Sequence, residues 1–127
     1  MLFRSKKDVI VRGGHKIYPA RIEALAMRHA AVARAAAVPV RDVRLGEKVC
    51  LAVHYCGGER LAPDTLLAHL DAGGLSPYDM PEFILELDAM PVTASGKIRK
   101  HAIVDLIERG DLRPAPVRWQ RKRQASR

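Results

Sequence analysis

The sequence predicts a small α/β (α+β) domain, in which a short central β-sheet is flanked by helices and preceded by an N-terminal β-hairpin. The 127 residues, 48% of them hydrophobic and 28% charged, have the size and composition of one globular domain. Short β-prone runs alternate with stretches whose apolar residues recur at helical spacing. Gly-Gly pairs and prolines separate these runs, and they mark where each element begins or ends.

The predicted hairpin comes first. Residues 8–11 and 15–18 are β-prone, and the Gly13-Gly14 pair between them is typical of a tight turn. Pro19 then stands at a position that suits the first turn of a helix. The side chains that recur at helical spacing after it are Ile22, Leu25, Ala26 and His29.

Two strands are predicted next. Residues 32–40 are nearly all Ala and Val, which is typical of a buried strand, and Pro39 marks either its end or a sheet edge. Residues 48–55 form the second strand, which ends before the glycine pair at 57–58.

The second half of the chain continues the alternation. A helix is predicted between Pro63 and Gly73, followed by a short strand at residues 83–87. Residues 91–96 are small or polar and predict a loop, and residues 98–107 carry the last helical stripe.

The net charge of +8 raises the question of an anionic partner. Only 5% of the residues are aromatic, so the chain has few rings on which bases could stack, and we predict no nucleic-acid partner. Residues 1–112 are predicted to form the domain, and residues 113–127 a basic, disordered tail.

No apolar run approaches the roughly 18 residues that span a bilayer, and the N-terminus lacks a secretory core, so we expect a cytoplasmic chain without a membrane span. Cys50 and Cys56 are expected to be reduced thiols in the core. No partners for them stand at metal-ligand spacing, so no metal site is expected in the chain itself.

The segment PVTASGKIRK, residues 91–100, carries the clearest chemical signal. Lys97 follows a glycine in a loop of small residues just ahead of a predicted helix. A lysine with this freedom can bring its charge to a carboxylate or phosphate, although most loop lysines are only solvated. The segment is not a phosphate-binding P-loop, because Ile98 follows Lys97 where that motif requires Ser or Thr.

Four segments in order resemble motifs of the C-terminal domain of the adenylate-forming (acyl-CoA synthetase, AMP-binding) superfamily. Residues 91–99 resemble its P-x-T-x-x-G-K-[IV]-x-[RK] motif, whose last position falls on Lys100. Residues 8–23 resemble its K-D-x-I-x-x-x-G-x-x-[IV]-x-P-x-E-I-E segment, whose first position falls on Lys7. Residues 45–47 (LGE) and 75–81 (LSPYDMP) resemble two further family turns. Ser5 departs from the pattern, because the family usually has an arginine at that place.

The resemblance implies a lid domain that starts at a hinge, matched here by Lys7. It implies two half-reactions, in which a carboxylic acid and ATP give an acyl-adenylate and CoA then takes the acyl group. Lys97 matches the lysine that serves the first step. ATP, the acid and Mg²⁺ are held by a large N-terminal adenylation domain, so this chain alone is expected to be incompetent.

For the CoA step, the resemblance assigns the Gly13-Gly14 turn to the pantetheine channel, where a missing side chain leaves room. Arg12 and Lys16 are candidate contacts for the CoA phosphates, with simple solvation as the alternative. The sequence looks most similar to ligases for medium-chain, alicyclic or aromatic acids. A lid that delivers acyl groups to a carrier protein and a free-standing binding or regulatory module are the alternatives.

Overall fold

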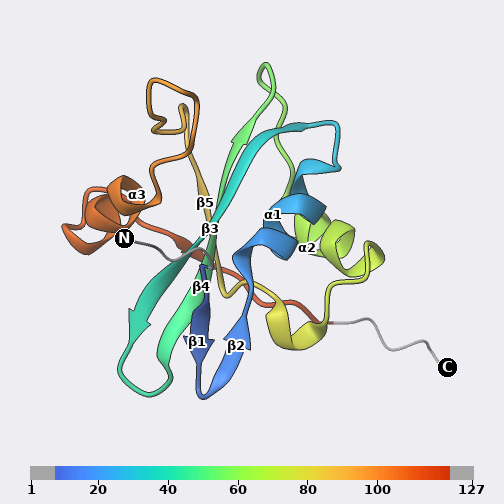
Figure 1. Cartoon of the computed structure of the whole chain (residues 1–127). Helices are drawn as coiled ribbons and strands as arrows, with labels where there is room; N and C mark the ends of the chain where they lie inside the picture. The colour runs from blue at the N-terminus through green and yellow to red at the C-terminus, as the bar shows by residue number, and fades with distance from the viewer. Residues whose placement is uncertain (1–7, 121–127) are drawn as a thin grey trace, which may run out of the picture.

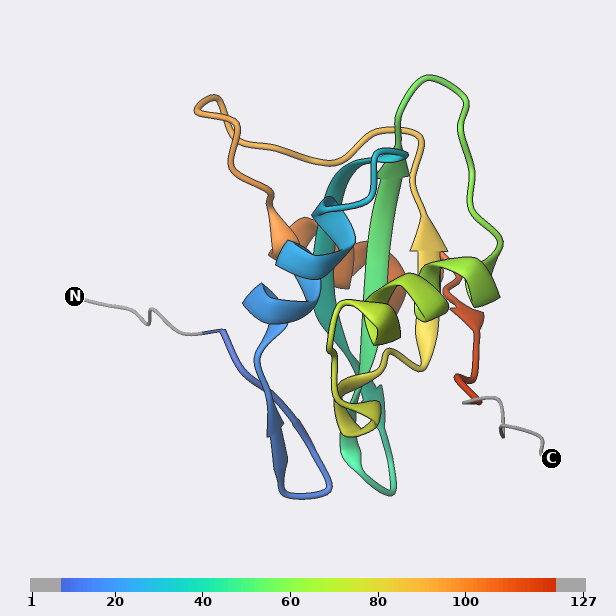
Figure 2. The same ribbon diagram turned by 90° about the vertical axis from the view of Figure 1, so that its right-hand side faces the viewer.

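The computed structural model describes residues 8–120 and confirms the predicted fold class (Figure 1). A six-stranded sheet has the order β2-β1-β4-β5-β6, with β3 paired to β4. Helices α1 and α2 cover one face of the sheet, and α3 covers the other (Figures 1 and 2). The strands are β1 (Ile10–Arg12), β2 (His15–Ile17), β3 (Val32–Asp42), β4 (Gly46–Tyr55), β5 (Phe83–Glu86) and β6 (Ala115–Pro116). The helices are α1 (Pro19–Met27), α2 (Pro63–Ala72), the 3-10 turn η1 (Pro77–Asp79) and α3 (Lys100–Glu108).

The predicted N-terminal hairpin is present as β1 and β2. Its turn uses Gly13 and Gly14 at φ +56° and +86°, a backbone region that side chains other than glycine rarely adopt. The hairpin is attached to the β3–β4 turn, because Gly13 N donates to Leu45 O at 2.8 Å and Val11 N donates to Glu47 Oε1 at 2.9 Å. The LGE segment, residues 45–47, therefore holds the hairpin against β4 by hydrogen bonds.

Strands β3 and β4 form a long antiparallel pair at the centre of the domain. Ala37 of β3 lies in the core beneath α1 and α2, whereas its neighbour Ala36 lies in the core beneath α3. Burial on both faces explains why residues 35–38 are all Ala or Val. Within residues 8–120, β3 pairs only with β4, so Pro39 lies in an edge strand.

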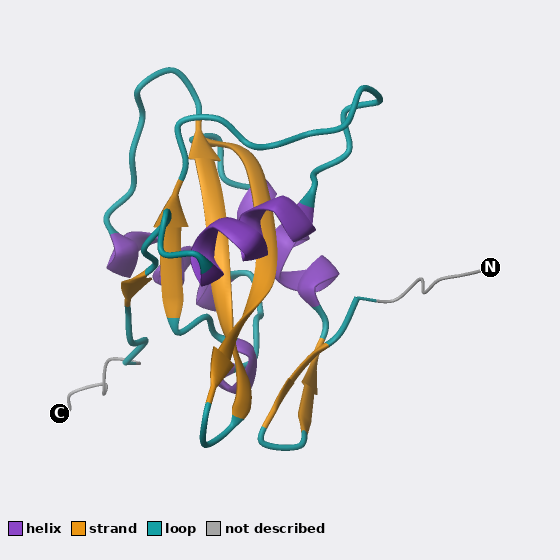
Figure 3. Ribbon diagram, turned by 90° about the vertical axis from the view of Figure 1, so that its left-hand side faces the viewer, coloured by secondary structure: helices purple, strands orange, loops and turns teal. Residues whose placement is uncertain are grey.

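Helices α1 and α2 begin where the sequence predicts, although α1 ends at Met27, before the predicted His29. Pro19 and Pro63 are the first residues of α1 and α2. The two helices pack closely, because a Cβ added to Gly73 would lie 2.9 Å from Leu25 Cδ2. On the other face, seen in Figure 3, α3 begins at Lys100, two residues later than predicted, because Ile98 forms a bridge with Val92.

Two features differ from the sequence prediction. Residues 113–120, expected in a disordered tail, include β6, which pairs with β5, and Trp119, which packs against the core. The apolar Val117 and Trp119 supply contacts that the basic composition of this segment conceals. Cys50 is buried as expected, but Cys56 is exposed, because it follows the last residue of β4. No helix among the described residues is long and apolar enough to cross a membrane.

Candidate functional site

The loop that carries Lys97 closes on itself. Thr93 N donates to Lys97 O at 2.8 Å, and Gly96 N donates to Thr93 O at 2.9 Å. Lys97 N donates to Thr93 Oγ1 at 3.1 Å. Gly96 has φ +91°, which explains the glycine before the lysine. Small and hydroxyl residues therefore build a compact turn that presents Lys97 at its end.

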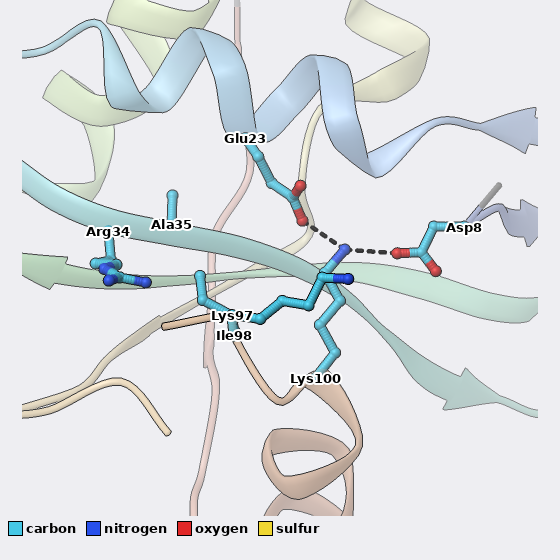
Figure 4. A pocket seen from close by; sticks show the side chains of 7 residues that line it. All are labelled: Asp8, Glu23, Arg34, Ala35, Lys97, Ile98 and Lys100. Carbon is cyan, nitrogen blue, oxygen red and sulfur yellow. Dashed lines mark hydrogen bonds and ion pairs between the residues drawn. The ribbon is translucent and has the colours of Figure 1, made fainter. Parts of the chain in front are cut away.

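The prediction that Lys97 lies on an exposed loop is confirmed. It borders an open hollow together with Arg34 and Lys100, as Figure 4 shows. Among residues 8–120, the Lys97 ammonium has no hydrogen-bond or ion-pair partner. An uncompensated ammonium beside a hollow can meet a carboxylate or phosphate without first breaking a contact.

The charge of Lys100 is compensated within the domain. Its Nζ lies 2.6 Å from Asp8 Oδ2 and 2.6 Å from Glu23 Oε2 (Figure 4). Glu23 Oε2 also accepts a hydrogen bond of 2.9 Å from Ala37 N, which lies on the edge of β3. Glu23 thus joins α1, β3 and α3, as expected of a structural helix residue. Of the two lysines that border the hollow, Lys97 is the one whose ammonium has no partner among residues 8–120.

The glycine turn of the hairpin lies open. A Cβ added to Gly14 would meet no atom within 4 Å, and one added to Gly13 would lie 3.4 Å from Leu45 Cδ2. Lys16 on β2 is exposed, and its ammonium forms no hydrogen bond or ion pair within residues 8–120. Figures 1 and 2 place this turn and the Lys97 loop at opposite ends of the domain.

Arg12, the other candidate for the CoA phosphates, already has partners within the domain. Its guanidinium forms an ion pair with Glu82 and donates to the backbone oxygen of Tyr78, and its side chain is only 15% exposed. A phosphate would have to displace Glu82 to reach it. The remaining candidate, Lys7, lies outside the described residues.

Sequence reasoning did not single out Lys100, Glu82 or Arg34. Their partners lie far away in the chain, as in the Arg34 contact with Gly96 and the Glu82 contact with Arg12. No local pattern identifies such pairs. Within residues 8–120, no three His, Cys, Asp or Glu side chains are grouped so that they could hold a metal ion.

Known proteins share the sequence pattern and the fold of this chain. Residues 21–97 match the family described as the AMP-binding enzyme C-terminal domain. The chain is 36% identical over 103 residues to the mitochondrial medium-chain acyl-CoA ligase ACSF2 of Danio rerio, covering 81% of this chain and 17% of the relative. It is 41% identical over 101 residues to a salicylyl-CoA synthase / salicylate adenylyltransferase of a Streptomyces species, covering 80% of this chain and 18% of the relative.

The crystal structure of an acyl-CoA synthetase from Brucella canis superimposes with a TM-score of 0.74 at 30% identity, covering 86% of this chain and 21% of that chain. The chain therefore spans only about a fifth of these relatives. The matched segment contains β3, β4, β5, α2, α1 from Arg21 onward and the lysine loop up to Lys97. The chain belongs to the AMP-binding enzyme C-terminal domain family, whose relatives here are acyl-CoA ligases.

Proposed function

We propose that this chain is the C-terminal lid of an ATP-dependent, AMP-forming acid–CoA ligase, and that it works only with a large N-terminal adenylation domain. The observation that carries the proposal is the exposed Lys97 ammonium, which has no partner among residues 8–120 and stands on a self-closed loop. The acyl-CoA ligases among the relatives supply the reaction class.

In the first half-reaction, a carboxylate oxygen bonds to the α-phosphorus of ATP and pyrophosphate leaves. Negative charge spreads over the oxygens around that phosphorus, and Lys97 contributes a positive charge to them. In the second half-reaction, the thiol of CoA takes the acyl group and AMP leaves. The turn at Gly13 and Gly14 serves this step by leaving a passage free of side chains.

The position of the two groups supports a division of labour. The lysine loop and the glycine turn lie at opposite ends of the domain (Figures 1 and 2), so one orientation of a lid cannot present both to one reaction centre. A rotation between the half-reactions brings each to the centre in turn. ATP, CoA and Mg²⁺ are thus the ligands of the assembled ligase, with the metal on the large domain.

The test joins this chain to the large domain of the Streptomyces salicylyl-CoA synthase, in place of the matching C-terminal part. We expect Lys97→Ala to lower salicylate-dependent ATP–pyrophosphate exchange by about 10²- to 10³-fold, the usual effect of removing one charge contact to a transition state. Thioester formation from preformed salicyl-adenylate should change little. Both half-reactions are followed by chromatography of the nucleotide and CoA products.

Two controls accompany this variant. Lys48→Ala removes an ammonium that pairs with Asp42 at 3.4 Å, away from the lysine loop, and should leave both half-reactions near the parent values. The 127-residue chain alone should give no exchange. An equal loss of both half-reactions in folded Lys97→Ala, or exchange by the chain alone, contradicts the proposal.

A further inference from the structure

A β-bulge determines where Arg34 points. In the pairing of β3 with β4, Val32 is opposite Tyr55 and Arg34 is opposite His54, so Ala33 is an extra residue. Strict alternation would put Val32 and Arg34 on the same face. Because of the bulge, these two residues lie on opposite faces of the sheet. Val32 packs in the core beneath α1 and α2, whereas Arg34 lies on the α3 face, as Ala36 does two residues later. The lysine loop lies on that second face.

Arg34 contacts the lysine loop directly. Arg34 Nη1 donates to Gly96 O at 2.9 Å, and the arginine is half-buried. The other hydrogen bonds of residues 92–97 within the described chain join members of the loop to one another. At the base of the loop, Arg99 N donates to Pro91 O at 2.8 Å, and Val92 is bridged to Ile98. Arg34 is therefore the hydrogen-bonding side chain that ties this otherwise self-contained turn to the sheet.

We propose that Arg34 is the positioning residue of Lys97. The Gly96 carbonyl and Lys97 N belong to the same planar peptide unit. A hydrogen bond that holds this oxygen therefore also holds the orientation of the backbone at Lys97. A half-buried guanidinium on the long strand β3 is a firmer support than the loop alone, and a displacement of about 1 Å at a reacting group can cost about 10²-fold in rate. The inference rests on the proposed role of Lys97, but the attachment itself can be measured without activity.

The first measurement uses the 127-residue chain and the backbone ¹⁵N order parameters of residues 93–97. Arg34→Met keeps an unbranched side chain and removes the donors, so the order parameters of the loop should fall while those of the sheet persist. Arg41→Met is the matched control on the same strand. Arg41 pairs with Glu108 at 3.3 Å and is 86% exposed, so its removal should leave the loop unchanged.

The second measurement uses the chain joined to the salicylyl-CoA synthase large domain. Arg34→Met should lower kcat of adenylation about tenfold, as expected for one lost hydrogen bond to a positioned group, with KM for ATP and thioester formation unchanged. Arg34→Lys retains one donor and should recover part of both the loop order and kcat. Combined with Lys97→Ala, Arg34→Met should add little further loss, because the positioned group is absent.

Each result has a separate meaning. Unchanged loop order in folded Arg34→Met overturns the inference. A raised KM for ATP with unchanged loop order also overturns it, since that result indicates a direct nucleotide contact. If Arg34→Met loosens the loop but Lys97→Ala leaves adenylation intact, the attachment stands and the proposed function of Lys97 fails.

Discussion

Lys97 and Lys100 stand three residues apart, and the fold gives their ammonium groups opposite environments. Lys100 lies within 2.6 Å of two carboxylates, whereas Lys97 extends from an exposed loop and has no partner among residues 8–120. The pairing of Lys100 limits its repulsion of Lys97 and removes it as a competitor for an anion. At this scale, the distribution of partners rather than the residue type distinguishes Lys97, the proposed binding lysine, from Lys100.

The two cysteines provide a test of burial at the residue scale. Burial raises the pKa of the Cys50 thiol to about 12, whereas Cys56 is exposed. Because the thiolate is the nucleophile, iodoacetamide at pH 8 should modify Cys56 rapidly and Cys50 only after unfolding. Mass spectrometry should show one modification in the native chain and two in urea. Cys56→Ser should remove the rapid modification; rapid modification of both native thiols contradicts the buried position of Cys50.

At the scale of elements, the proposed role of the hairpin turn in the CoA step can be tested by comparing Gly14 with a glycine of similar φ in another turn. In the joined ligase, Gly14→Leu should reduce thioester formation and retain pyrophosphate exchange, because a branched side chain enters the open passage. Gly14 has φ +86°, so the substitution also costs about 1–2 kcal/mol of backbone strain.

Gly58→Leu is the control for that strain. Gly58 has φ +84° and equally open surroundings, and it follows the far end of β4. It should lower thermal stability as much as Gly14→Leu does and leave thioester formation intact. If Gly14→Leu abolishes exchange in a folded protein, the two ends of the domain have been assigned in the wrong order.

The β3–β4 turn depends on a single carboxylate. Asp42 Oδ2 accepts from Leu45 N at 2.8 Å and from Arg44 N at 3.1 Å. The Leu45 N–H is the largest cause that holds the pKa of Asp42 below its usual value, with Lys48 and Arg44 adding to it. A lowered native pKa stabilises the fold above the unfolded pKa of about 3.9, and this stabilisation is lost as pH falls through the native pKa.

Asp42→Asn should therefore reduce the urea midpoint at pH 7 more than at pH 3. The comparison is made on the unfolding curves of parent and variant at both pH values. The difference between the two proteins should shrink as acid protonates Asp42 in the parent. A difference that is the same at both pH values indicates that the Asp42 carboxylate charge is not what supports the turn.

At the scale of the whole molecule, Glu82 joins segments from both ends of the chain. Its carboxylate pairs with Arg12 and accepts from Val49 N at 2.9 Å, while its backbone oxygen accepts from Val117 N at 2.8 Å. Hairpin, central strand and C-terminal segment thus meet at one residue. Such a contact stabilises the domain by holding the hairpin strand β1 against β4 and the C-terminal segment.

Arg12→Met should destabilise the domain by about 2 kcal/mol, because it leaves a partly buried carboxylate without its charged partner. Urea unfolding followed by fluorescence of Trp119, the single tryptophan, measures the change. Arg60→Met removes an exposed pair with Glu86 at 3.4 Å and should change stability by less than about 0.5 kcal/mol. Equal effects of both variants contradict the special position of Arg12.

Local sequence determined the elements and the family resemblance of this protein. Glycine pairs, prolines and apolar spacing act over a few residues, so the hairpin, β3, β4 and the starts of α1 and α2 could be predicted from them. The same holds for the lysine loop, whose turn is closed by its own Thr93 and Gly96. Such features need no partner from elsewhere in the chain.

Only the tertiary structure decided which partners the charged side chains contact. The pairs Arg12–Glu82 and Arg34–Gly96 join residues far apart in sequence, and their partners depend on strand order and on a one-residue bulge. The pairing of β6 with β5 could not be predicted from the sequence either, because the basic charge of residues 113–120 suggested a solvated tail. In the structure, Val117 and Trp119 of this segment pack against the core. Long-range contacts of this kind follow from the packing of the whole sheet, and short-range propensity carries no information about them.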